Sequence, residues 1–276
     1  MLLKLKIFLY NLLITRFKIW WTLNCNPLIR GQRKNPNSIP IIIINYNQLF
    51  YLKILVDFLL KKKFENIIII DNLSTYPPLL EYYKSLQGVA IEYMDKNYGH
   101  MVFFEKEELL HKYGKGFFVV TDADIMPNDK LPDNFLKQML LILLKEFSSV
   151  NKVGFALDIE NIPDYYIKKD NVIKWETKFW QRKYLNSSTE AYISSIDTTF
   201  ALYMPNFFQK YREVDFFSGI RLAGNYLAKH GGWYIDYDNL SEEQKYYQKT
   251  ATNSSSWNLD DNFNFNKNIK THYNTN

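Results

Sequence analysis

The chain has almost no cysteine, because Cys25 is the only one among its 276 residues. A single cysteine excludes an internal disulfide framework, and it excludes zinc sites built from several cysteines. Cysteine usage this low fits a reducing compartment. We therefore expect a cytoplasmic protein.

Acidic residues are absent from the first 34 residues, which hold seven lysines and arginines. The whole chain has 34 basic and 29 acidic residues, so the rest of it keeps 27 basic against 29 acidic. The basic character thus belongs to an N-terminal leader, residues 1–34. The body lacks the positive charge that nucleic acids attract, and we expect no nucleic-acid partner.

Long apolar runs are also missing. The longest uncharged stretch within residues 1–23, residues 7–15, is far shorter than the ~20 apolar residues that span a bilayer. Charges recur after this stretch and no small-residue cleavage site follows, which argues against a signal peptide. Residues 1–23 suit either an amphipathic helix in the membrane surface, with Trp20 and Trp21 at the lipid interface, or a helix packed on the protein itself. The first alternative places the protein peripherally on the cytoplasmic face of the membrane.

The first half of the chain alternates strand and helix patterns. Four apolar, β-branched runs predict buried strands at residues 39–44, 66–70, 89–93 and 116–121. Residues 49–63, 77–86 and 101–113 have helical periodicity between them. This alternation predicts an α/β fold with a doubly wound, mostly parallel sheet and helices on both faces. Residues 31–38 suggest a polar linker before it.

The pattern changes after residue 128. A helix is expected at 133–147 and strands at 153–158 and 193–203, with a long aromatic segment, residues 161–188, that is typical of a cleft-covering insertion. We assign residues 35–128 to one half of a domain, residues 129–252 to the other half, and residues 253–276 to an asparagine-rich, weakly ordered tail.

Polar residues follow each predicted parallel strand, at the edge where ligands bind in such sheets. They are Asn47, Asp71, Asn97, Asp122 and Asp124. The last two are spaced i, i+2 and project to one side of an extended chain, which is costly unless a cation lies between them. A divalent ion bridging to a diphosphate would fill that role. The alternative is an acidic turn that caps a helix.

Four motifs in order carry a resemblance to a known family: Ile-Ile-Asn-Tyr-Asn at residues 43–47, Ile-Asp-Asn at 70–72, Asn-x-Gly at 97–99 and Thr-Asp-Ala-Asp at 121–124. Their order and spacing resemble the family 2 glycosyltransferases of the GT-A fold, closely over residues 39–128 and loosely beyond. The resemblance implies that Tyr46, Asn47 and Asp71, with Asn97 nearby, hold the base and ribose of a UDP-sugar or GDP-sugar. It implies that Asp122 lies near the ribose and the metal, and that Asp124 coordinates Mn²⁺ or Mg²⁺.

A second cluster lies at residues 219–234. In GT-A enzymes a late histidine often completes the metal site, so the resemblance implies that role for His230, with His100 as a competing candidate. Arg221 could clamp the diphosphate. The alternatives are a buried histidine and a surface arginine on a helix.

An inverting transferase also needs a carboxylate that takes the proton of the acceptor hydroxyl. The family's Glu-Asp motif is missing here, which leaves the base and the stereochemical outcome open. The nearest candidate is Asp197, with Asp158 and Glu176 as alternatives and a buried structural role as a further one. Tryptophans 175, 180 and 233 could stack on an acceptor sugar or pack in the core.

These features together predict a metal-dependent glycosyltransferase that transfers a sugar to a hydroxyl of a glycan or glycolipid, as in cell-surface polysaccharide synthesis. One rival is a non-catalytic nucleotide-sugar-binding or membrane-associated protein on a decayed transferase scaffold. Another is a sugar-1-phosphate nucleotidyltransferase, which ranks lower because residues 45–48 contain neither glycine nor a basic residue.

Overall fold

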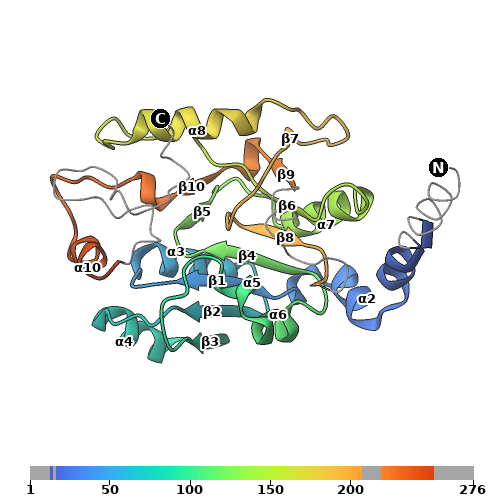
Figure 1. Cartoon of the computed structure of the whole chain (residues 1–276), viewed down its shortest axis with the longest axis horizontal. Coiled ribbons are helices and arrows are strands. Elements are labelled where there is room, and N and C mark those ends of the chain that lie inside the picture. Colours follow the sequence, from blue (N-terminus) through green and yellow to red (C-terminus); the bar gives the residue numbers. More distant parts are fainter. Residues whose placement is uncertain (1–12, 15–16, 207–218, 252–276) are drawn as a thin grey trace, which may run out of the picture.

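The structure, a computed structural model, describes residues 13–14, 17–206 and 219–251. Its centre is an eight-stranded sheet of order β3-β2-β1-β4-β8-β6-β9-β7 (Figure 1). The strands are β1 (Ile41–Asn45), β2 (Ile67–Asp71), β3 (Val89–Tyr93), β4 (Phe118–Asp122), β6 (Lys152–Phe155), β7 (Ala191–Ile193), β8 (Ala201–Tyr203) and β9 (Gly219–Leu222). Only β8 and β7 run against the other six, so the mostly parallel α/β sheet is confirmed.

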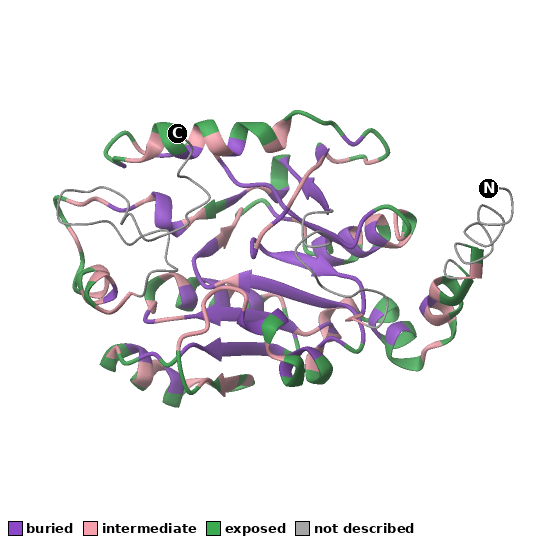
Figure 2. Cartoon of the chain, viewed as in Figure 1, coloured by how far each residue is buried: buried purple, intermediate pink, exposed green. Residues whose placement is uncertain are grey.

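Helices cover both faces of this sheet. The described ones are α2 (Pro27–Lys34), α3 (Phe50–Lys61), α4 (Pro77–Ser85), α5 (Val102–Glu105), α6 (Glu107–Tyr113), α7 (Phe135–Lys145), α8 (Lys169–Glu176) and α10 (Glu242–Thr250), with 3₁₀ turns η1 (Pro36–Ser38), η2 (Thr177–Trp180), η4 (Gly224–Tyr226) and η5 (Gly231–Trp233). Alternate residues of β1 face opposite ways: Ile41 and Ile43 pack with α3 and α7, and Ile42 and Ile44 pack with α5 and α6. Burial on both sides explains the continuous isoleucine runs (Figure 2).

The register of the parallel strands aligns their polar ends. Asn45 of β1 pairs with Asp71 of β2, and Ile44 pairs with Asp122 of β4. The carboxyl ends of these three strands therefore meet at one edge of the sheet, as predicted. A separate two-stranded ladder of β5 (Ile125–Pro127) and β10 (Ala228–His230) continues from the same edge.

Several predicted boundaries are wrong. Residues 31–34 belong to α2 rather than to a linker, because Asn26 caps this helix and the buried Gln32 bonds the backbone of Phe117 in both directions. The helix expected at 101–113 breaks at Lys106, whose backbone is extended. The strand expected at 193–203 is two short strands joined by residues 194–200. The tail, residues 253–276, lies outside the described residues.

The described part of the leader packs partly on the protein itself. Residues 17–25 are helical, and Leu23 is buried in the core. Phe17, Trp20 and Trp21, on the same helix, are each more than half exposed. Within the described part of the chain, no helix has the length and apolar character needed to cross a membrane.

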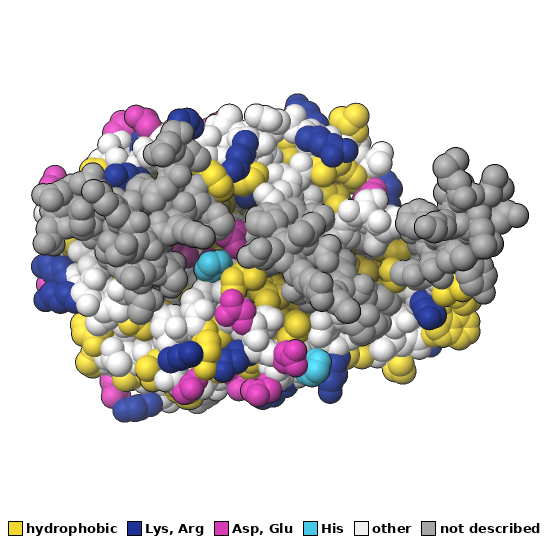
Figure 3. Space-filling model, in the orientation of Figure 1, with side chains coloured by type: hydrophobic (Ala, Val, Ile, Leu, Met, Phe, Trp, Pro, Cys, Tyr) yellow, Lys and Arg dark blue, Asp and Glu magenta, His cyan; other side chains and the backbone are white. Residues whose placement is uncertain are grey.

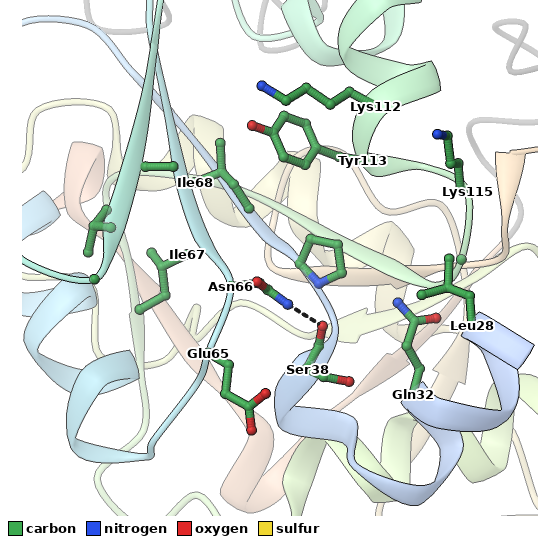
Figure 4. A pocket seen from close by; sticks show the side chains of 15 residues that line it. Leu28, Gln32, Ser38, Glu65, Asn66, Ile67, Ile68, Lys112, Tyr113 and Lys115 are labelled. Carbon is green, nitrogen blue, oxygen red and sulfur yellow. Dashed lines mark hydrogen bonds between the residues drawn. The ribbon is translucent and has the colours of Figure 1, made fainter.

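A pocket of about 510 Å³ opens at the opposite, N-terminal edge of the sheet (Figure 4). Two of its polar side chains bond within the protein: Asn66 donates to the carbonyl of Ser38 at 2.7 Å, and Lys112 pairs with Glu92 at 2.6 Å. Because these groups already have partners and the pocket lies away from the polar strand ends, it does not belong to the predicted site.

Candidate active site

Asp122 ends β4 and is held by the 194–200 loop. Its backbone N–H donates to the carbonyl of Thr198 at 2.8 Å, and the Thr198 hydroxyl donates to its carboxylate Oδ2. Desolvation raises the pKa of the Asp122 carboxyl well above its ordinary value, and the charges of Asp124 and Asp197 raise it further, against the Thr198 hydrogen bond. A cation beside this carboxylate would offset the cost of its buried charge.

Asp124 lies next to His230, as the predicted metal site requires. Antiparallel pairing of Ile125 with His230 brings the two segments together. The His230 Nδ1 is 3.3 Å from the Asp124 Oδ2, and the backbone N–H of Gly232 donates to the same oxygen at 3.2 Å. The Asp124 carboxylate is thus contacted by two groups, from His230 and Gly232, that lie more than a hundred positions later in the chain.

Two aromatic rings fix the segment that carries His230. The His230 ring stacks on buried Trp233, with ring centroids 5.0 Å apart. A Cβ on Gly231 would lie 2.4 Å from a ring carbon of Tyr51. The glycine at 231 is therefore required by close packing of Tyr51, and Trp233 serves the core rather than an acceptor sugar.

The described residues offer few ligands for a divalent metal ion. Within the described ranges there is no group of three or more histidine, cysteine, aspartate or glutamate side chains that could enclose a metal ion. Asp124 and His230 offer two ligands, with Asp122 close to them. Mg²⁺-type ions commonly bind to one or two carboxylates and complete their coordination with substrate phosphates and water. The donor set suits a metal held jointly with a diphosphate.

The residues predicted to bind the donor form hydrogen bonds within the loops that follow the strands. The Asp71 carboxylate accepts from the Ser74 N–H at 2.8 Å and from the Tyr83 hydroxyl at 2.8 Å. The Asn47 Oδ1 accepts from the N–H groups of Thr75 and Tyr76. Asn47 and Asp71 thus join the loops after β1 and β2 into one unit. Sequence reasoning missed Tyr83, which lies in the last turn of α4 and belongs to no recognisable motif.

Two further predicted residues also bond to the backbone. The Tyr46 hydroxyl donates to the carbonyl of Thr250 at 2.6 Å, and Asn97 accepts from the N–H of Gly99 at 2.8 Å. Asn72 then donates to the carbonyl of Gly99 at 3.0 Å and holds this turn beside β2. The loop after β3 is therefore connected to the end of β2, and the connecting side chain is that of Asn72. His100 lies in the same loop, whereas it is His230 that contacts Asp124.

Helix α10 closes the far side of the first loop, which the sequence reasoning missed. The Glu243 carboxylate accepts from the backbone N–H groups of Leu49 and Phe50 at 2.9 and 3.1 Å, at the start of α3. Ser241 and Gln244 form a capping box at the start of α10. This Ser-x-x-Gln pattern was the signal that could have revealed the helix.

The candidates for the base differ in their surroundings. Asp158 accepts three hydrogen bonds from the turn at residues 160–161. Glu176 forms a buried ion pair with Arg221 at 2.7 Å. Asp197 lies in the 194–200 loop, close enough to Asp122 to raise its pKa. The carboxylates of Asp158 and Glu176 are thus engaged in structural contacts, and Arg221 lies on a strand in a buried ion pair rather than on the surface of a helix.

Comparison with known proteins gave structural likenesses alone. No protein-family model matches the chain, and no curated protein matches it. A mannosyltransferase, PcManGT of Pyrobaculum calidifontis, solved with GDP-Man and Mn²⁺, has 11% identity and a TM-score of 0.45, with 86% of this chain and 72% of that one covered.

Two other solved structures also resemble this chain. S. aureus TarS 1-349 has 14% identity and a TM-score of 0.37, and the match covers 61% of this chain and 47% of that one, so the chain spans about half its length. A cytidylyltransferase of Leptospira borgpetersenii has 11% identity and a TM-score of 0.36, with 63% of each chain covered. Likenesses this distant do not distinguish the two enzyme classes.

Proposed function

We propose that this protein is a metal-dependent glycosyltransferase that uses a UDP-sugar or GDP-sugar donor and a hydroxyl of a glycan or glycolipid as acceptor. The observation that carries the proposal is the meeting of Asp124 and His230 beside Asp122, at the edge where β1, β2 and β4 end. This edge also carries the motifs that resemble family 2 glycosyltransferases.

In this proposal each residue has a defined task. Asp124 and His230 hold Mn²⁺ or Mg²⁺, and the bound metal neutralises the departing diphosphate. The loops fixed by Asn47, Asp71 and Asn97 form the wall for the base and ribose. Asp197 accepts the proton of the acceptor hydroxyl as its oxygen attacks the anomeric carbon.

One contact argues against a sugar-1-phosphate nucleotidyltransferase. Such an enzyme would bind phosphates with the loop after β1 and the first N–H groups of α3. Here the Glu243 carboxylate accepts hydrogen bonds from the N–H groups of Leu49 and Phe50. A negative charge at this position would repel a phosphate, which supports the diphosphate site at Asp124 instead.

The same proposal places the protein at a membrane surface. Four apolar side chains of the leader are exposed and follow helical spacing: Leu13, Phe17, Trp20 and Trp21. Hydrophobic side chains are visible at this end of the molecule together with basic ones (Figure 3). An apolar stripe with tryptophans in a segment without acids suits an anionic lipid interface.

Ligand-dependent stability tests the metal and donor assignment. We expect UDP or GDP with Mn²⁺ to raise the unfolding temperature, since a ligand at 100 times its Kd adds about 2.7 kcal/mol to the unfolding free energy. Asp124→Asn should abolish this Mn²⁺-dependent shift, and the exposed Asp129→Asn should keep it. A full shift in Asp124→Asn would contradict the proposed metal site.

Turnover separates the transferase from the decayed scaffold. Release of UDP or GDP from nucleotide-sugars in the presence of Mn²⁺ is expected for wild type. Nucleotide binding without any release, with or without glycan acceptors, would favour the non-catalytic alternative.

A further inference from the structure

Two buried cations lie beneath the 194–200 loop, and the reaction proposed above uses neither of them. Lys152 of β6 is fully buried, and Arg221 of β9 is only 4% exposed. The strands that carry them are adjacent and parallel. Buried lysine and arginine are rare unless they have a specific partner.

Both cations donate to neighbouring carbonyls of that loop. The Lys152 Nζ donates to the carbonyl of Ile196 at 2.6 Å, and the Arg221 Nε donates to the carbonyl of Ser195 at 2.7 Å. Arg221 is itself held by Glu176 at 2.7 Å and lies 4.1 Å from the ring centroid of Phe179. The loop is therefore fixed from below at two consecutive peptide groups.

Thr198, two residues after Ile196, contacts the candidate site. Thr198 bonds both the backbone and the carboxylate of Asp122, and Asp197 lies between Thr198 and the peptide held by Lys152. Gly219 lies against the loop so closely that a Cβ there would be 2.9 Å from Ile196. Displacement of Ile196 would therefore move Asp197 relative to Asp122.

Burying the charge of Lys152 lowers the unfolding free energy of the protein. Burial lowers the pKa of Lys152 to about 7, with Asp197 opposing and Arg221 adding to that effect. Replacing a buried charge by an apolar residue of similar volume is often neutral or stabilising. A role in placing the loop accounts for a buried lysine better than a role in holding the fold together.

We propose that Lys152 and Arg221 are positioning residues that hold the 194–200 loop so that Asp197 and Thr198 meet Asp122. The inference rests on the proposed function, because positioning matters where Asp197 and Asp122 act. It predicts that the effect of Lys152 appears in turnover and loop order and not in global stability.

The test compares Lys152→Met with Lys152→Arg. The matched control is Lys145→Met, because the ammonium of Lys145 also donates to a carbonyl, that of Asn186 at 3.2 Å, but at an exposed site. Unfolding temperature, affinity for UDP or GDP with Mn²⁺, kcat and donor KM are measured for each. Lys152→Gln replaces Lys152→Met if the latter does not fold.

We expect Lys152→Met to unfold at the wild-type temperature or above and to bind nucleotide within about twofold, while kcat falls about 10- to 100-fold, as misplacement by an ångström can cause. Lys152→Arg should recover part of kcat, and Lys145→Met should match wild type. Wild-type kcat in a folded Lys152→Met would overturn the inference.

Hydrogen–deuterium exchange separates this inference from the proposed function. Amides of residues 194–200 and of Asp122 should exchange faster in Lys152→Met than in wild type, with β1 unchanged. If wild type binds no nucleotide, the proposed function fails and exchange still reports the positioning. Unchanged exchange in that loop would overturn the inference.

Discussion

The Asp122 carboxylate is unfavourable to ionise in the folded protein. Its pKa is raised by desolvation, by Asp124 and by Asp197, so the folded state binds this proton more tightly than the unfolded state. The unfolding free energy of the metal-free protein must then fall as pH rises from the ordinary aspartate pKa to the raised one. At pH values below both pKa values the carboxyl is protonated in the folded and unfolded states, and Asp122 then adds no pH dependence to the unfolding free energy.

We expect Asp122→Asn to flatten this pH dependence, because the amide oxygen can still accept from Thr198 and carries no charge. The measurement is urea unfolding of metal-free wild type and Asp122→Asn across pH 4 to 8. Relative to wild type, the variant should gain stability as pH rises. A constant difference between the two proteins over this range would show that the Asp122 charge has no such cost.

At the scale of elements, the leader helix has one side chain buried in the core and an exposed aromatic face. Leu23 is buried in the core, while Phe17, Trp20 and Trp21 are exposed and their rings group together, with Phe17 6.2 and 6.1 Å from the two indoles. We expect the full chain to cosediment with vesicles that contain anionic lipid and less with neutral vesicles. Trp20→Ala with Trp21→Ala should reduce this binding severalfold.

The control for the leader is Leu185→Ala, which removes an 86% exposed apolar side chain from another part of the surface. It should bind vesicles as wild type does. Equal binding of the double tryptophan variant and wild type would assign the exposed stripe to another partner.

Elements with a strong local sequence pattern could be predicted from the sequence. Elements whose residues depend on side chains distant in the sequence could not. The isoleucine runs of β1 and β2 announce buried parallel strands by composition alone. Strand β9 is four residues long and contains a buried arginine, whose charge is tolerated only because Glu176 and Ser195 lie beside it. Such tertiary pairing leaves no local pattern, and the same holds for Lys152 in β6.

At the scale of the whole molecule, the candidate site joins segments far apart in the chain. Asp122 and Asp124 could be found from their spacing after a strand, but their geometry with His230 depends on the pairing of β5 with β10. The resemblance to GT-A enzymes suggested a late histidine. The pairing of β5 with β10 is what brings His230 to Asp124, and sequence spacing does not fix which loops meet across more than a hundred residues.

Helix α10 makes a second long-range connection, and its Glu243 offers the sharpest test of it. The carboxylate accepts from two N–H groups at the start of α3, 193 and 194 residues away in the chain. Desolvation raises the pKa of this carboxyl, against the two backbone hydrogen bonds. Loss of a side chain that caps a helix N-terminus costs about 0.5–2 kcal/mol, so Glu243→Ala should lower the unfolding free energy by about that amount.

Glu243→Gln should lose less, because its amide oxygen still accepts from the α3 backbone while the favourable charge at the helix N-terminus is gone. Glu242→Ala is the matched control: this neighbour is exposed and forms a surface ion pair with Lys245 at 2.9 Å, so stability should stay unchanged. Urea unfolding measures all three variants, and UDP or GDP affinity with Mn²⁺ is measured alongside. If α10 fixes the loop after β1 as its contacts indicate, Glu243→Ala weakens nucleotide binding as well as stability, whereas a loss of stability with unchanged affinity would limit α10 to a role in the fold.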